Sequence, residues 1–190
     1  MGVEETLAFF KPDGMINKHA QQAFKDYLCI YDLDIKEEKA IRPDEDLMRT
    51  HYKDLQGRLP DHVIEEIIGY VTATGKSFKD YHEHLKRTYP DDGIAETFPG
   101  HLQAYHIIGD DAVSKVRAFL GPTNPSKTHE DGEPLSLGLK VRPQFGSTHC
   151  GGIYNIAHAT DKPENAPGEL IRFGFTPLYT CKDRKKPKHL

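Results

Sequence analysis

The stretch Thr6-Leu7-Ala8-Phe9-Phe10, followed directly by Lys11-Pro12-Asp13-Gly14, decides how this chain begins to fold. A short apolar run that stops at a Pro-Asp-Gly turn signal is typical of a buried strand. Apolar residues then recur at helical spacing from about His19 to Tyr31, which predicts an amphipathic helix. The chain therefore opens with a strand, a polar turn and a helix.

The rest of the chain continues this alternation of extended and helical patterns. We predict strands over 33–41 and 102–108, helices over 43–55, 61–71, 110–120 and 164–173, and a last inner strand within 141–149. The apolar residues of 33–41 are scattered among charges, so this strand is expected at a sheet edge. The order predicts an α/β (α+β) protein with a ferredoxin-like βαββαβ antiparallel sheet and helices on its surface. No repeat or second domain interrupts it, so 1–190 is interpreted as one domain with insertions.

Composition limits the classes of function. A chain of 190 residues is long enough to bury a core, while 37% hydrophobic content predicts long polar loops as well, among them 124–138. The net charge of -4 argues against a general nucleic-acid binder, and no specific nucleic-acid partner is expected. An anionic substrate would need a local cluster of Arg and Lys in an acidic protein.

Cysteine usage indicates a protein of a reducing compartment, and hydropathy indicates that it has no membrane anchor. Cys29, Cys150 and Cys181 are far apart and lack metal-ligand spacing, which is typical of reduced thiols. No apolar run reaches membrane-spanning length and no secretory signal opens the chain, so we expect a cytoplasmic protein that makes no membrane contact. Gly2 to Thr6 fits the myristoylation pattern formally, but the acids Glu4 and Glu5 favour a plain first strand.

Three polar segments carry the candidate chemistry. They are Lys11 to Gly14; Arg117-Ala118-Phe119-Leu120-Gly121-Pro122-Thr123-Asn124-Pro125; and Tyr154-Asn155-Ile156-Ala157-His158, with Glu169 eleven residues after the histidine. Further candidates lie between these segments: Tyr52 in His51-Tyr52-Lys53-Asp54-Leu55, then Arg58, and Arg142 three residues before Phe145. Each segment alone is a weak signal. Together, in this order and spacing, they resemble the nucleoside diphosphate kinase family.

The resemblance implies transfer of the terminal phosphate from a nucleoside triphosphate to a nucleoside diphosphate through a phosphohistidine. It assigns the catalytic roles to His158, Glu169, Lys11 and Tyr52, and nucleotide or phosphate binding to Lys11, Arg58, Arg117, Thr123, Arg142 and Asn155. His158 is the implied nucleophile and Glu169 the acid that orients its ring, a pairing that suits covalent catalysis. Mg²⁺ would arrive on the nucleotide phosphates and not in a protein cage, so no protein metal ligands are expected.

Three departures mark a divergent member of that family. About thirty residues, 72–100, are inserted and carry enough aromatic and apolar groups for a folded helical segment. Leu59-Pro60-Asp61 stands where the family has an aromatic residue, so base stacking is reduced. Longer loops after Asn124 and Phe145 prevent a hexamer from being carried over, although a dimer-based homo-oligomer is expected. Residues 176–190 are predicted to form a tail.

Alternatives stay open at this stage. The same fold could serve as a nucleotide-binding or scaffold module without turnover, or as a phosphohistidine-based protein phosphotransferase. Tyr52 could be helix packing, Glu169 a solvated helix residue, and Arg58 or Arg172 surface ion pairs. Histidines without metal-ligand spacing are expected to be structural or surface residues: His82, His84, His101, His106 and His149.

Overall fold

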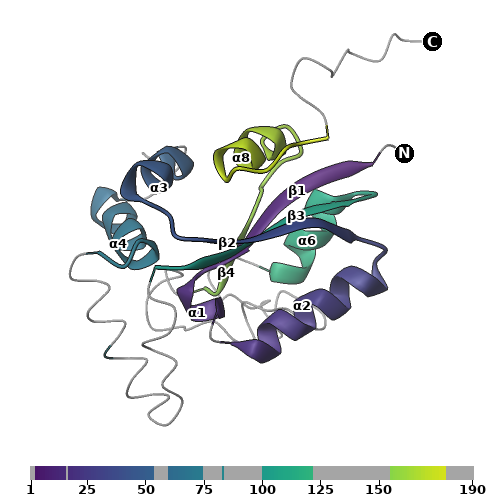
Figure 1. Cartoon of the computed structure of the whole chain (residues 1–190), viewed down its shortest axis with the longest axis horizontal. Helices are drawn as coiled ribbons and strands as arrows, with labels where there is room; N and C mark the ends of the chain where they lie inside the picture. Colours follow the sequence, from purple (N-terminus) through teal and green to yellow (C-terminus); the bar gives the residue numbers. More distant parts are fainter. Residues whose placement is uncertain are drawn as a thin grey trace, which may run out of the picture.

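The computed structural model describes residues 3–15, 17–53, 60–74, 83, 100–121 and 155–178. Its elements are β1 (Glu4–Phe10), α1 (Pro12–Met15), α2 (Lys18–Ile30), β2 (Asp34–Ile41), α3 (Glu45–His51), α4 (Asp61–Val71), β3 (Leu102–Gly109), α6 (Ala112–Leu120), β4 (Ala157–Ala159) and α8 (Ala166–Arg172) (Figure 1). Among these, no helix combines the length and apolar character needed to span a bilayer.

The four strands form one sheet in the order β2-β3-β1-β4, with antiparallel pairing at every step. This order and the alternation of strands and helices confirm the predicted ferredoxin-like fold. The predicted edge position of the second strand is also confirmed, because β2 pairs with β3 alone in the described sheet. The strand predicted within 141–149 lies outside the described residues, and the strand found beside β1 is Ala157–Ala159. Three residues are too few to show a period of two, which is why the sequence did not reveal β4.

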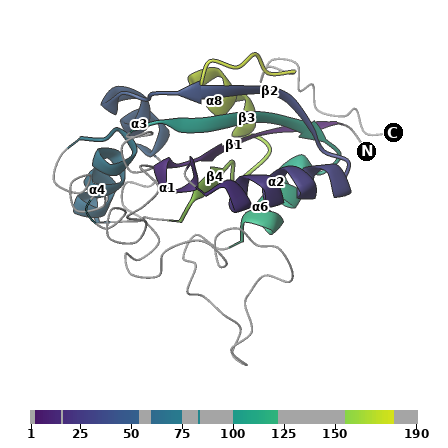
Figure 2. The same ribbon diagram turned by 60° about the horizontal axis from the view of Figure 1, so that its bottom comes forward.

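Helices cover both faces of the sheet, and this explains the uninterrupted apolar run of β1. Leu7 and Phe9 point to the face covered by α3, α4 and α8, whereas Ala8 and Phe10 point to the face covered by α2 and α6. Figure 2 shows α8 on one side of the sheet with α2 and α6 on the other. All four side chains are buried, so β1 is the centre of both cores.

Capping residues explain where the helices begin. The Asn17 side chain accepts a hydrogen bond from the Ala20 amide at 2.9 Å and starts α2. The Asp44 side chain accepts one from the Leu47 amide at 2.8 Å and starts α3. The helix predicted over 43–55 ends at His51, and 54–59 lie outside the described residues. So do most of the 72–100 insertion, the loop over 124–138 and the tail beyond Leu178.

A close backbone approach at Gly14 joins α1 to the segment that leads into β4. A Cβ atom at Gly14 would lie 2.5 Å from the Ile156 carbonyl oxygen and 2.6 Å from the Phe10 ring, so only glycine fits there. Ile156 itself has a φ of 70°, a conformation that costs a β-branched residue about 1–3 kcal/mol. Packing against α1 therefore holds a strained backbone two residues before His158.

Candidate functional site

His158 takes its position from the pairing of β4 with β1. The register sets Phe9 opposite His158, and the two rings stack with centroids 4.7 Å apart and planes at 20°. The Thr160 amide donates to the Leu7 carbonyl at 3.0 Å and extends this pairing beyond the strand. The His158 ring is thus fixed against the sheet on one face, with a side chain that remains 22% exposed.

Glu169 reaches the same ring from α8. One of its carboxylate oxygens, Oε2, lies 3.4 Å from His158 Nε2 and accepts a hydrogen bond from the Thr160 hydroxyl at 2.8 Å. Burial raises the pKa of Glu169, although the neighbouring His51 and the Thr160 hydroxyl act in the opposite direction. Pro167 lies in the first turn of α8, where a proline is tolerated, so it leaves Glu169 free to face His158. The contact at Nε2 leaves Nδ1 as the ring nitrogen that Glu169 does not engage.

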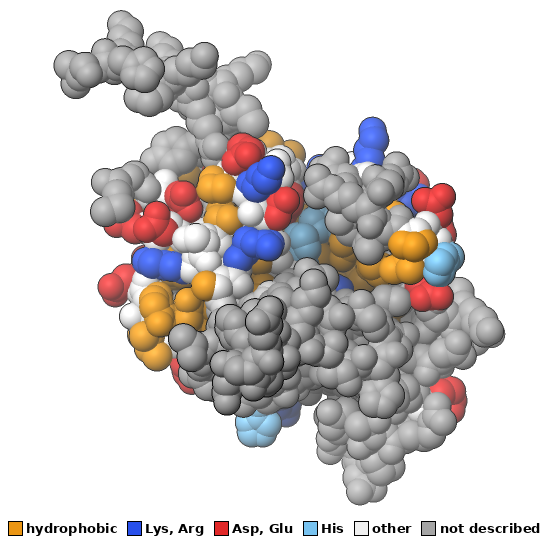
Figure 3. Space-filling view, turned by 180° about the vertical axis from the view of Figure 1, so that it is seen from behind, with side chains coloured by type: hydrophobic (Ala, Val, Ile, Leu, Met, Phe, Trp, Pro, Cys, Tyr) orange, Lys and Arg blue, Asp and Glu red, His pale blue; other side chains and the backbone are white. Residues whose placement is uncertain are grey.

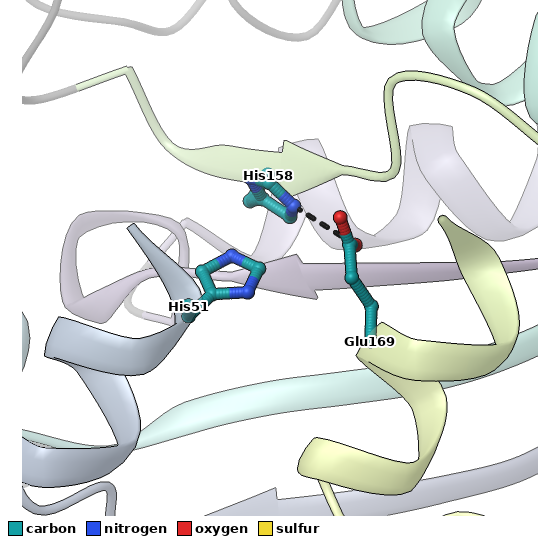
Figure 4. A group of neighbouring side chains, drawn as sticks. All are labelled: His51, His158 and Glu169. Carbon is teal, nitrogen blue, oxygen red and sulfur yellow. Dashed lines mark hydrogen bonds and ion pairs between the residues drawn. The ribbon is translucent and has the colours of Figure 1, made fainter. Parts of the chain in front are cut away.

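His51 is a third member of this cluster that the sequence did not assign. It closes α3, it is only 7% exposed, and its ring meets the His158 ring edge to face with centroids 4.4 Å apart. Its Nδ1 lies 3.4 Å from Arg172 Nη1, so Arg172 contacts a buried histidine. Burial lowers the pKa of His51 well below its usual value, so the ring is neutral. Figure 4 shows how His51, His158 and Glu169 converge from α3, β4 and α8.

Lys11 and Asn155 form a buried polar pair at the end of β1. Lys11 Nζ donates to Asn155 Oδ1 at 2.9 Å, and the Lys11 amide donates to the Ile156 carbonyl at 2.7 Å. Lys11 is only 5% exposed and Asn155 only 2%. Two candidates from segments 144 residues apart are thereby brought into direct contact.

Asp13 and Tyr70 fasten this pair to α4. The Tyr70 hydroxyl donates to the Asp13 carboxylate and accepts from the Asp13 amide at 2.9 Å, while the Ile156 amide donates to the same carboxylate at 2.8 Å. Burial raises the pKa of Asp13, and the Lys11 charge opposes that shift. The Pro-Asp-Gly turn therefore has a structural use: it ties α1, α4 and the β4 entry together.

Tyr52 caps α3 beside a hollow between α3 and α4. Its ring stands edge-on to the His158 ring, with centroids 6.4 Å apart. The hollow measures about 280 Å³ and is lined by Arg49, Tyr52, Asp61, Ile64, Glu65 and Ile68. Arg49 is paired with Glu65 there at 2.5 Å, so this hollow offers two acids and one neutralised base. Its charge suits a polar neutral group better than a phosphate.

Arg117 lies near the loop that follows His158. It is exposed in the last turn of α6. Although burial raises it, the pKa of the Asp161 carboxyl is lowered overall by a hydrogen bond from Asn165 and by the charge of Arg117. On the face drawn in Figure 3, Lys and Arg side chains of the described residues are interspersed with Asp and Glu. The predicted Arg58, Thr123 and Arg142 lie outside the described residues.

Comparison with known proteins identifies relatives of this arrangement. The family model "Nucleoside diphosphate kinase" matches residues 67–177. A nucleoside diphosphate kinase from Listeria monocytogenes is 30% identical over 99 residues, which are 52% of this chain and 59% of that protein. One from Thermococcus kodakarensis is 27% identical over 172 residues, which are 88% of this chain and 75% of that protein. The chain thus spans about 59% of the length of the Listeria relative.

Solved structures agree on the fold. A transition-state mimic of nucleoside-diphosphate kinase from Borrelia burgdorferi, with bound vanadate and ADP, superposes with a TM-score of 0.64 at 18% identity, over 98% of this chain and 93% of that chain. At this identity the likeness concerns the fold alone. The family match, however, takes in more than half of the 190 residues, and it shows that this chain belongs to the nucleoside diphosphate kinase family.

Proposed function

We propose that this protein transfers the terminal phosphate of a nucleoside triphosphate to a nucleoside diphosphate, in two half-reactions that share a phosphohistidine at His158. Membership of the family supports nucleotide phosphate transfer as the class of reaction. The single observation that carries the finer proposal is the contact between Glu169 and His158 Nε2, because it selects which nitrogen attacks.

The Glu169 carboxylate accepts a hydrogen bond from Nε2–H of the neutral His158 imidazole, so the proton stays on Nε2 and the lone pair of the ring stays on Nδ1. Nδ1 then attacks the terminal phosphorus while the bond from phosphorus to the bridging oxygen breaks, and the nucleoside diphosphate leaves with that oxygen. In the second half-reaction, a terminal oxygen of another diphosphate attacks the same phosphorus and the bond to Nδ1 breaks. The stack on Phe9 holds the ring in one plane through both steps.

The charge of the transferring group needs fixed donors around it. Lys11 is a buried cation, and its hydrogen bond to Asn155 holds it in place. Arg117, together with Arg142 and Thr123, supplies further donors in this proposal, and Arg58 contacts the nucleotide. Mg²⁺ enters with the nucleotide, since the cluster at His158 has a single carboxylate and Mg²⁺ prefers several oxygen ligands.

The hollow beside Tyr52 is the proposed place of the nucleoside. Its acids repel phosphate but accept hydrogen bonds from ribose hydroxyls or exocyclic amines. The Borrelia relative, whose structure carries vanadate and ADP, is consistent with a nucleotide on this fold. The functional protein is proposed to be a dimer-based homo-oligomer, which light scattering after size exclusion would test.

The direct test is nucleotide exchange. Purified protein is mixed with ATP, Mg²⁺ and a second diphosphate, and formation of the new triphosphate is followed. His158→Gln should abolish exchange, whereas His62→Gln, an exposed histidine on α4, should leave it unchanged. Exchange that survives in the His158 variant would overturn the proposal. Phosphorylation of His158 without exchange would instead favour a protein phosphotransferase, and binding without either reaction a scaffold module.

A further inference from the structure

The cluster of His51, His158 and Glu169 has a second chemical capacity beside phosphate transfer. Each residue offers one ligand atom, and the three atoms lie within 4.8 Å of one another. Two imidazoles and one carboxylate are the donor set of many zinc sites, and they suit Co²⁺, Ni²⁺ and Cu²⁺ as well. This donor set is the wrong one for Mg²⁺, which is bound through oxygen.

His51 supplies an independent reason to expect a ligand here. Its Nε2 is buried and has no hydrogen-bond partner among the described residues, although its side chain is almost wholly enclosed. Arg172 occupies the other ring nitrogen. Buried polar atoms are nearly always satisfied, so an orphaned one beside a second imidazole and an acid needs an explanation. In Figure 4 a ring nitrogen of His51 is directed toward the His158 ring.

We propose that His51 Nε2, His158 Nε2 and the Glu169 carboxylate form a site for one divalent transition-metal ion such as Zn²⁺, and that the bound ion switches His158 off. Metal bonds of about 2.0–2.1 Å at tetrahedral angles set neighbouring ligand atoms about 3.3 Å apart. The distance between His158 Nε2 and Glu169 Oε2, 3.4 Å, already matches this ligand-to-ligand separation. The three ligand atoms lie within 4.8 Å of one another, so the remaining gaps must close by up to about 1.5 Å through side-chain rotation when the ion binds.

The inhibition follows from the position of one proton. A neutral imidazole carries a single ring proton, and a metal on Nε2 moves that proton through solvent to Nδ1. No proton is gained or lost, but the lone pair that attacks phosphorus is gone. This consequence rests on the proposed function, whereas metal binding itself does not.

Arg172 gives the proposal a distinctive signature. A guanidinium only donates, so in the metal-free protein Nδ1 of His51 accepts from it and the His51 proton is on Nε2. Metal binding at Nε2 moves this proton to Nδ1, where it faces the Arg172 donor. Arg172 therefore competes with the metal through both charge and tautomer, and removing it should tighten binding.

The test uses the full chain, freed of metal with a chelator and titrated with Co²⁺ and then Zn²⁺. We expect one ion per chain, with the visible absorption of tetrahedral Co²⁺ and no thiolate charge-transfer band. His51→Phe keeps an aromatic ring among Phe9 and Phe173 and should weaken binding at least tenfold. Arg172→Met should strengthen it several-fold. Equal Zn²⁺ affinity in the native protein and His51→Phe would overturn the proposal; if that variant does not fold, unchanged or weaker binding in Arg172→Met does so.

A second measurement separates this proposal from the proposed function. Zn²⁺ added before Mg²⁺ and ATP should slow phosphorylation of His158 more than tenfold in the native protein and not in His51→Phe. ATP binds zinc in solution equally in both reactions, so the variant controls for that loss. A Co²⁺ spectrum without any phosphorylation would contradict only the phosphotransfer. Phosphorylation with no metal bound would contradict only the metal site.

Discussion

Replacement of Glu169 by glutamine tests how the acid acts on His158. The amide keeps the size of the side chain and still accepts from Thr160, but it removes the charge that faces His158 Nε2. A hydrogen bond to a charged group contributes about 1.5–3 kcal/mol. The contact is long, 3.4 Å, and the His158 and Glu169 side chains are 22% and 13% exposed, which puts it at the lower end. A loss of about 1.5 kcal/mol corresponds to roughly tenfold in rate.

The Glu169→Gln substitution should also change how the rate of phosphohistidine formation depends on pH. Because burial raises the pKa of Glu169, the native protein loses the acceptor charge as pH falls through that raised value. The glutamine variant has no such group, so its rate should show a smaller decline with acid. Rapid-quench measurement of phosphohistidine formation between pH 5 and 8 would reveal both effects. An unchanged rate together with an unchanged profile would refute the role given to Glu169.

Stability should move in the opposite direction. The folded state holds the Glu169 proton more tightly than the unfolded chain, so unfolding free energy falls as pH rises from the unfolded pKa to the folded one. Above both pKa values the native protein carries the full free-energy cost of burying the Glu169 charge, and the glutamine substitution removes that cost. At pH 7.5 the thermal midpoint of Glu169→Gln should be higher than that of the native protein while its activity is lower. A variant that is both slower and less stable would show that glutamine damages packing.

The remaining predictions concern the groups around this pair. Lys11→Met should remove the buried ammonium that donates to Asn155 and slow phosphoenzyme formation by roughly 100-fold, as for other preorganised donors to a transferring group; near-normal single-turnover kinetics would contradict this. Tyr70→Phe should cost about 1–3 kcal/mol in urea unfolding, because it strands polar groups of Asp13, and an unchanged midpoint would show that water replaces the hydroxyl. Arg117→Ala should lower turnover by at least tenfold, with normal rates placing the phosphate elsewhere. Since Leu59 replaces the expected aromatic residue, purine and pyrimidine diphosphates should differ by less than about tenfold, or 1.4 kcal/mol, in competition assays, and a strong base preference would point to specific hydrogen bonds.

The fold could be predicted from sequence because its signals are local and repeated. β1 is a short apolar run that stops at a turn signal, α2 and α3 begin at capping residues, and the order of strands and helices indicates a ferredoxin-like sheet. β4 escaped prediction because its pairing is non-local: Phe9 meets His158 across the chain, and three residues carry no period of their own. The predicted strand over 141–149 stays a prediction.

Only those residues of the candidate site that belong to sequence motifs could be predicted. The resemblance to the family implied roles for Lys11, Asn155, His158 and Glu169, and the structure brings these four residues together in two contacting pairs. His51 was missed because a lone histidine before Tyr52 has no pattern; its importance comes from burial and from contact with His158. The sequence places Asp13 in a turn, and only the tertiary structure reveals its hydrogen bond with Tyr70. Sequence motifs therefore reveal residues that belong to a recognisable pattern, whereas residues that act through burial and tertiary contact are recognised only in the structure.

His158 is the proposed carrier of the phosphate, and locating that phosphate on the protein tests this assignment. The protein is incubated with Mg²⁺ and ATP labelled on the terminal phosphate, quenched in base, digested and sequenced by mass spectrometry. We expect one acid-labile phosphate on His158, attached through Nδ1, and its complete discharge when a nucleoside diphosphate is added before the quench. Absence of phosphate from His158, or a label on another residue that persists in His158→Gln, would contradict it.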